Sequence, residues 1–96
     1  MASNNYAHFN TLASNVVSGQ ACELTEVTIN TAGAAANTLT LYDSATVAGA
    51  SSANTIAVIN TVVSNIVTLD YNAQCRSGLV AVLATGTAAD VTVSFR

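Results

Sequence analysis

The chain has 96 residues, of which 7% are charged and 51% are hydrophobic, and its formal net charge is −3 at pH 7. A chain of this length forms one domain with a modest core, which leaves little room for a deep active site. Its two cationic side chains, Arg76 and Arg96, cannot supply the basic surface that binds nucleic acid or an anionic membrane. No apolar run approaches the ~20 residues of a membrane span, and the N-terminus shows no leader pattern, so we expect synthesis and assembly in a cytoplasm.

Short runs rich in Val, Ile, Thr, Leu and Tyr alternate with clusters of Gly, Ala, Asn, Asp and Ser, which is typical of β-sandwiches and barrels. The runs predict strands, in chain order, at residues 5–12, 21–30, 37–43, 54–60, 64–72, 78–84 and 90–95. No segment has the pattern of a long helix. We therefore predict an all-β fold, an antiparallel β-sandwich or a jelly-roll-like barrel of about seven to eight short strands.

The first residues, 1–20, are interpreted as an N-terminal arm that can contribute a first strand, and residues 21–96 as the β-sandwich domain. The aromatic residues Tyr6 and Phe9 indicate that part of the arm docks on its own sandwich or on a neighbouring molecule.

In the run 21–30 the apolar phase slips, because Cys22 and Leu24 point one way while Val27 and Ile29 point the other. This slip predicts a β-bulge around residues 25–26.

The run 37–43 alternates cleanly, with Leu39 and Leu41 on one face and Thr38, Thr40 and Tyr42 on the other, and the runs 64–72 and 90–95 alternate in the same way. Residues 44–54 are small and of low complexity, which favours a surface loop. The run 78–84 has no polar face, so it is either a central strand or one whose outer face is covered by a partner.

The strand edges lack the usual protection against pairing with other chains, because the sequence has no Pro, no Lys and few charges of any kind. A nearly uncharged surface also favours burial in an assembly. We therefore expect the protein to work by assembling with copies of itself or with a larger protein surface.

The two cysteines, Cys22 and Cys75, are too few for a zinc site, and no metal or cofactor is expected. They are interpreted as two buried small hydrophobic residues, with a Cys22–Cys75 bridge as the alternative.

Catalysis is not expected, because His8 is the only histidine and no G-x-S-x-G segment accompanies it. Carboxylates Asp43, Asp70 and Asp90 lie at or near strand ends, where they are interpreted as acceptors for turn backbone and as surface charge. The residues proposed to contact a partner are Tyr6, His8, Phe9, Leu12 and Tyr42.

The chain from Cys22 to its end resembles the small capsid decoration, or cement, proteins of tailed bacteriophages. The resemblance is carried by ACELTEVTINTAG, LTLYDSATVAG, IAVI, TLDYN and SGLVAVLATGTAADVTVSFR. It implies a β-sandwich on the outer capsid surface of the virion, often a homotrimer, that binds the major capsid protein and tightens the joints between capsomers. N-terminal arms of such proteins often make shell contacts, which corresponds to residues 2–12 here. The alternative is a receptor- or glycan-binding module of a phage tail, fibre or head spike.

Overall fold

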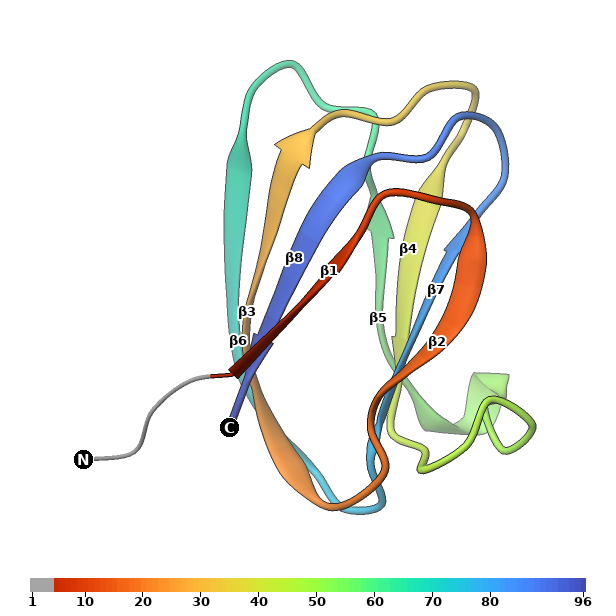
Figure 1. Ribbon diagram of the computed structural model, residues 1–96, viewed down its shortest axis with the longest axis vertical. Helices are drawn as coiled ribbons and strands as arrows, with labels where there is room; N and C mark the ends of the chain where they lie inside the picture. The colour runs from red at the N-terminus through yellow and green to blue at the C-terminus, as the bar shows by residue number, and fades with distance from the viewer. Residues whose placement is uncertain (1–4) are drawn as a thin grey trace.

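The computed structural model describes residues 5–96, which form eight strands and one short 3₁₀ helix (Figure 1). The strands are β1 (Asn5–Phe9), β2 (Ala13–Ser18), β3 (Cys22–Thr31), β4 (Thr38–Tyr42), β5 (Thr55–Asn60), β6 (Val67–Cys75), β7 (Leu79–Ala84) and β8 (Asp90–Phe95), and the helix η1 is Ser52–Asn54. The all-β prediction is confirmed.

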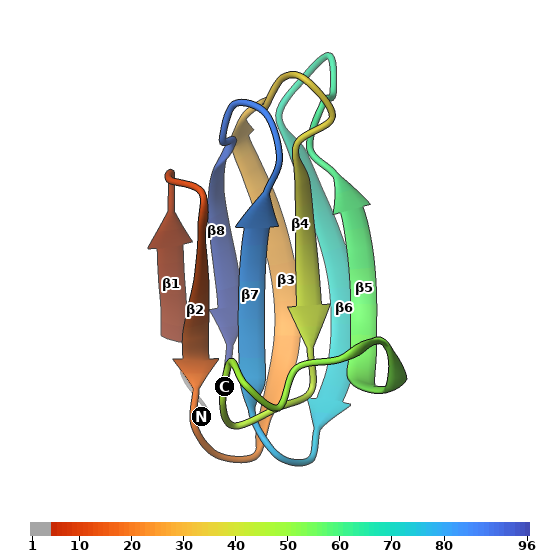
Figure 2. The ribbon, with the colours of Figure 1, turned by 90° about the vertical axis from the view of Figure 1, so that its right-hand side faces the viewer.

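The strands form two four-stranded antiparallel sheets, which face each other as a sandwich (Figure 2). Sheet A has the order β1-β8-β3-β6, and sheet B has the order β2-β7-β4-β5. The chain crosses between the sheets at every connection except the one from β4 to β5. This wrapping, with the first and last strands side by side, is the strand order of a jelly roll.

The N-terminal region supplies one strand to each sheet. β1 pairs with β8 in sheet A, and β2 pairs with β7 in sheet B, so residues 5–18 belong to the sandwich. The strand predicted at 5–12 ends at Phe9, and β2 was not predicted, because only Val16 and Val17 within it favour a strand. Residues 1–4 of the predicted arm lie outside the described part of the chain.

The core lies between the sheets and is built from the alternating apolar residues. Its most deeply buried large side chains are Leu24, Val27, Ile29, Leu39, Leu41, Leu79, Val91 and Val93. The predicted bulge is confirmed, because the register of β3 shifts between Leu24 and Glu26 against both of its neighbours. Against β8, Thr25 is the extra residue, whereas against β6 the extra residue lies on β6, where Tyr71 and Asn72 stand opposite Thr25 alone. At this irregularity Leu24 and Val27 both face the core.

β7 lies between β2 and β4, which confirms the prediction of a central strand. Val80 is fully buried although it faces outward, opposite Tyr42. The segment after β4 passes over this end of the sheet, and its Ser44 carbonyl lies 2.6 Å from where a side chain at Gly78 would begin (Figure 2). The outer face of this end of β7 is therefore covered by the chain itself.

The buried side chain of Asn37 joins three connections at one end of the sandwich. Its Oδ1 accepts hydrogen bonds from Thr61 Oγ1 (2.6 Å) and from the backbone N–H of Ala89 (3.1 Å). Its Nδ2 donates to the carbonyl oxygens of Ala84 (3.1 Å) and Thr85 (2.9 Å). The β3–β4, β5–β6 and β7–β8 connections are thus held by one amide group.

The absence of a side chain at Gly33 leaves the space that this hydrogen-bond network occupies. A Cβ atom at Gly33 would lie 2.5 Å from Thr61 Oγ1 and 2.6 Å from Asn37 Oδ1, which is too close for any side chain. The Gly33 N–H donates to the Thr61 carbonyl (3.1 Å), so the backbone itself packs on the network.

Asp43 holds the β6–β7 turn at the opposite end. Its carboxylate accepts backbone hydrogen bonds from Ser77 (2.9 Å), Arg76 (3.0 Å) and Gly78 (3.4 Å). The bonds from Ser77 and Arg76 are the main reasons that the pKa of Asp43 lies below its ordinary value of 3.8. For Asp43, this confirms the interpretation that the strand-end carboxylate satisfies turn backbone.

We predict that Asn37→Ala lowers the free energy of unfolding by at least about 3 kcal/mol, because several buried donors and acceptors lose their partner at once. Urea unfolding at neutral pH measures the change. Asn10→Ala, at an exposed position of the β1–β2 turn, is the control and changes stability by less than about 0.5 kcal/mol. A loss of less than about 1 kcal/mol in Asn37→Ala would contradict the role given to the network.

We predict that Asp43→Ala costs about 1.5–3 kcal/mol at neutral pH, the range for hydrogen bonds to a charged group. Because folding lowers the pKa of Asp43, its contribution is complete above the ordinary value of 3.8 and disappears as the pH falls through the folded-state value. The difference in stability between the wild type and Asp43→Ala therefore shrinks as the pH falls below 3.8. Urea unfolding across the acid range checks this, with the exposed Asp70→Ala as control for the lost charge.

Candidate functional site

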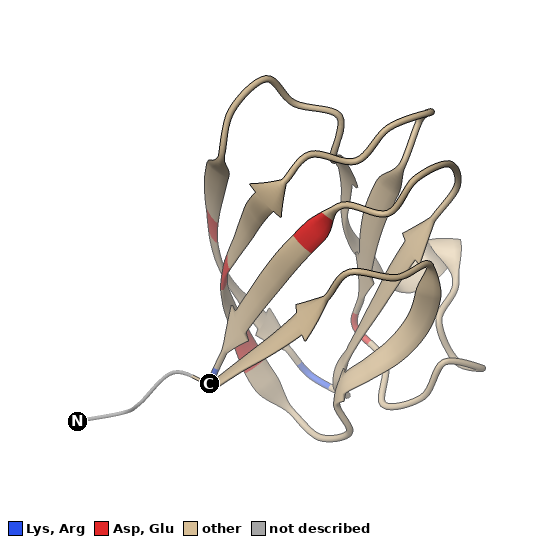
Figure 3. Ribbon diagram, turned by 45° about the horizontal axis from the view of Figure 1, so that its top comes forward, with Lys and Arg blue, Asp and Glu red and all other residues tan. Residues whose placement is uncertain are grey.

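The outer face of sheet A carries most of the acidic residues of the protein. Four of the five acidic residues lie on its strands (Figure 3), namely Glu23, Glu26, Asp70 and Asp90. Their strand neighbours pack in the core, so these four carboxylates point outward. Arg96 pairs with Glu23, with 2.6 Å between Nε and Oε1. Glu26 and Asp70 lie directly opposite each other on neighbouring strands, an arrangement in which like charges repel. This face is therefore polar and negatively charged.

The outer face of sheet B is different, because none of its four strands contains a charged residue. One row of outward side chains crosses all four strands, from Ser14 through Val82 and Thr40 to Val58. Val58 is 66% exposed. We call the accessible outward residues of this sheet the uncharged face; its members are Ser14, Val16, Thr38, Thr40, Tyr42, Val58, Asn60, Val82 and Ala84.

Exposed apolar side chains stand on two sides of the uncharged face. Val58 on the edge strand β5 is largely accessible to solvent, and Val16 on β2 and Leu12 in the β1–β2 turn are each about half exposed. Thr40 and Val82 lie between them and are half-buried. The face thus offers methyl and hydroxyl groups to a partner, with no charge that binding would have to desolvate.

The five partner-contact residues predicted from the sequence do not form one surface. Tyr6 and His8 project from β1 on the outer face of sheet A, where Tyr6 is 74% exposed. Phe9 lies on the inward side of β1 and packs against the core. Leu12 lies in the turn after β1, and Tyr42 is half-buried on the uncharged face, on the opposite side of the sandwich.

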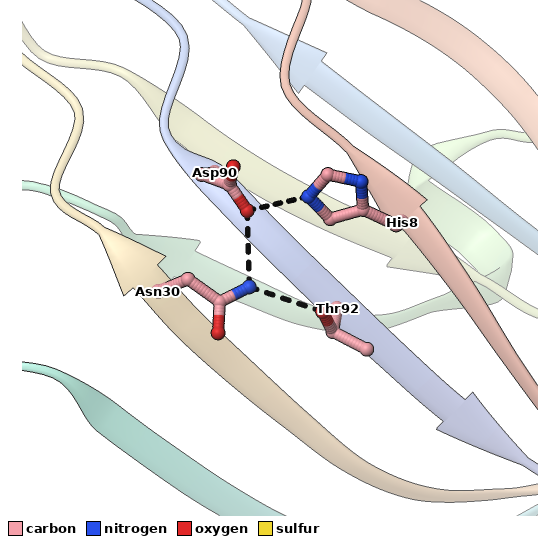
Figure 4. Close-up of polar contacts among 4 residues, drawn as sticks. All are labelled: His8, Asn30, Asp90 and Thr92. Atoms are coloured by element: carbon pink, nitrogen blue, oxygen red, sulfur yellow. Dashed lines mark hydrogen bonds and ion pairs between the residues drawn. The ribbon is translucent and has the colours of Figure 1, made fainter.

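His8 belongs to a polar cluster that ties three strands of sheet A together (Figure 4). His8 Nε2 lies 2.6 Å from Asp90 Oδ1, and Asn30 Nδ2 donates to the same oxygen at 3.0 Å. Asn30 Nδ2 also donates to Thr92 Oγ1 at 3.0 Å. The bond from Asn30 and then the one from His8 lower the pKa of Asp90.

A histidine held by a carboxylate can transfer protons when a nucleophile lies on its other ring nitrogen. Within residues 5–96, no hydroxyl or thiol is hydrogen-bonded to His8. The cluster also lies on an open sheet face, and no pocket is found in this part of the chain. The His8 cluster therefore links β1, β8 and β3 across the sheet.

Metal ligands do not gather in groups of three or more among the described His, Cys, Asp and Glu residues. The described residues also contain no helix with the length and apolarity needed to span a bilayer. Comparison of the chain with protein-family models, curated proteins and solved structures gives no match. The two outer faces and the strand edges are therefore the features of the molecule that bear on its function.

The sequence alone does not indicate that Val16 and Val58 lie on the same face of one sheet. The signal was present, since residues 13–18, 38–42, 55–60 and 79–84 all lack charge. Only the strand order shows that these four runs form one sheet.

We predict that Asn30→Ala raises the pKa of Asp90 towards its ordinary value of 3.8, because the carboxylate loses its main hydrogen-bond donor. His8→Ala raises it by a smaller amount. A carboxyl-carbon NMR titration measures both shifts. Thr28→Val, which removes a hydroxyl bonded to Thr68 on the same face, is the control and leaves Asp90 unchanged. An unchanged Asp90 titration in Asn30→Ala would contradict the geometry of the cluster.

Proposed function

We propose that this protein is a non-enzymatic structural protein of a bacteriophage particle. In this proposal it binds the outer surface of the capsid shell between capsomers, contacts the major capsid protein and stabilises the shell. The observation that carries the proposal is the uncharged face of sheet B, with Val16 and Val58 exposed on it. Exposed apolar groups on a face without charge favour protein–protein contact, because burying them costs no desolvation of ions.

The contrast between the two faces also gives the bound protein an orientation. With the uncharged face on the shell, the acidic face of sheet A would point outward into solvent. Four carboxylates there, against the single histidine His8 and the paired Arg96, keep neighbouring particles apart by charge repulsion. The opposite orientation would bury the opposed carboxylates of Glu26 and Asp70, which is costly without cationic partners.

We also propose that the protein associates with itself as a homotrimer. The edge strand β5 supports this part of the proposal. β5 is the outermost strand of sheet B, and its sequence TIAVIN has no charge and no Pro. No strand of the described residues pairs with the outer side of its backbone, and the usual protective residues are missing from β5. The edge of sheet A on the same side, β6, carries Asp70 and a left-handed Asn72 (φ 50°) that disturbs regular pairing.

The jelly-roll strand order is consistent with this role, since viral coat proteins use it, but lectin domains use it as well. Glycan-binding sites on such sandwiches generally need aromatic platforms. Here Tyr6 and Tyr42 lie on opposite faces, and Tyr42 is half-buried. The arrangement favours the structural role over the alternative of a glycan-binding module.

The test mixes purified protein with expanded, undecorated shells of the virus whose genome carries this coding sequence. We expect the wild type to co-sediment with the shells. Val58→Lys weakens binding at least about tenfold, because docking would bury an unpaired ammonium group. Ile66→Lys is the matched control: Ile66 is 73% exposed but lies outside the uncharged face, so binding is unchanged. Circular dichroism confirms that both variants are folded.

Three results would contradict the proposal, each in a different part. If the wild type does not sediment with the shells under any assembly condition, the capsid role is wrong. If Val58→Lys binds as tightly as the wild type, the uncharged face is not the docking surface. Native mass spectrometry that finds only monomers at micromolar concentration would contradict self-association.

A further inference from the structure

Cys22 and Cys75 lie directly opposite each other on two neighbouring strands. Cys22 is the first residue of β3, Cys75 is the last residue of β6, and the two are partners in the antiparallel register. Both are free thiols in this structure and both belong to the hydrophobic core. Because their side chains project from the same face of sheet A, the two sulfur atoms approach each other inside the sandwich.

The backbone distance suits a disulfide bond. Opposed residues in antiparallel strands have Cα atoms about 4.5–5.5 Å apart, within the about 4.4–6.8 Å found for disulfides. The strands therefore need no large movement to bring the sulfur atoms together. The pKa of the Cys75 thiol is raised to about 12, mainly by burial and in smaller part by the neighbouring Cys22 thiol.

The register at this point is held from both sides. The Gln74 side chain donates from Nε2 to the Cys22 carbonyl oxygen at 3.1 Å, across the β3–β6 pair. On the other side of β3, Glu23 and Arg96 exchange two backbone hydrogen bonds of 2.6 and 2.9 Å, and their side chains form an ion pair. Cys22 is therefore fixed opposite Cys75 before any bond forms.

We propose that Cys22 and Cys75 are an oxidation site that forms a reversible cross-strand disulfide by exchange with a low-molecular-weight disulfide. Cys22, which retains 8% exposure, loses its proton and attacks the oxidant, and one thiol leaves. Cys75, fully buried, then loses its proton and attacks the Cys22 sulfur of the mixed disulfide, and the second thiol leaves. Two protein S–H bonds become one S–S bond, and the oxidant is reduced to two thiols.

The bond would strengthen the sandwich at one end of an edge strand. β6 is one edge of sheet A and, among residues 5–96, pairs with β3 alone, so the link fastens its end to the interior of the sheet. It also closes the long stretch of chain between residues 22 and 75, which restricts the unfolded state and raises the midpoint of thermal unfolding by roughly 10 °C or more. The site does not depend on the proposed capsid role.

The experiment incubates the reduced, folded chain with oxidised glutathione at mildly alkaline pH until the products no longer change. A second sample is refolded from denaturant in a glutathione redox buffer, so that burial of Cys75 cannot block the reaction. Intact-mass analysis and alkylation under denaturing conditions count the remaining thiols. Cys22→Ala and Cys75→Ala are the matched single-thiol controls, and reduction with dithiothreitol tests reversibility.

The expected product is a chain that has lost two hydrogen atoms and carries no disulfide to another chain. It resists alkylation, keeps its native circular dichroism spectrum and unfolds at a higher temperature. The single-thiol variants stop at the mixed disulfide or remain reduced. The proposal is overturned if both samples retain two alkylatable thiols, or if they yield only mixed disulfides or disulfide-linked dimers. It is also overturned if the intramolecular bond forms only with loss of the native spectrum.

Discussion

The side chains of Asn37 and Asp43, immediately before and after β4, hold the connections at the two ends of the sandwich. A jelly roll crosses repeatedly between its sheets, so its connections bring backbone N–H and C=O groups to the ends of the core, where they need partners. Asn37 supplies partners to three connections at one end, and Asp43 supplies them to the β6–β7 turn at the other. With both ends fixed, β4 presents Leu39 and Leu41 to the core at a set register.

Asp43 is used to hold a turn, and the other charged side chains remain on the surface. In a chain with so few charges, one carboxylate is committed to a turn and the remaining four lie on one sheet. The other sheet is left with hydroxyl and methyl groups outside. Two faces of such different character give a small module a preferred side for binding, and a β-sandwich separates them because neighbouring residues of a strand point to opposite sides.

The strand edges and the cysteine pair both affect how the outermost strands of this small sandwich are stabilised. β5 has an uncharged edge that a neighbouring subunit could cover, whereas β6 has a charge, a left-handed residue and a thiol placed opposite Cys22. One edge is suited to a partner and the other to a link within the chain. Both devices suit a domain whose modest core leaves a small margin of stability.

The sequence by itself determined the all-β class, the core positions Leu39 and Leu41 and the bulge in β3, because strand periodicity records which side chains are buried. For β7 it left two alternatives, a central strand or one covered by a partner, and the strand order decided for the central place. The sequence did not reveal β2, whose short polar run lacks alternation and becomes a strand only by pairing with β7. The uncharged face, the tie between His8 and Asp90 and the opposition of Cys22 and Cys75 were decided by the tertiary structure alone. Each depends on which strands become neighbours, and pairing between distant segments is set by the packing of the whole chain rather than by local pattern.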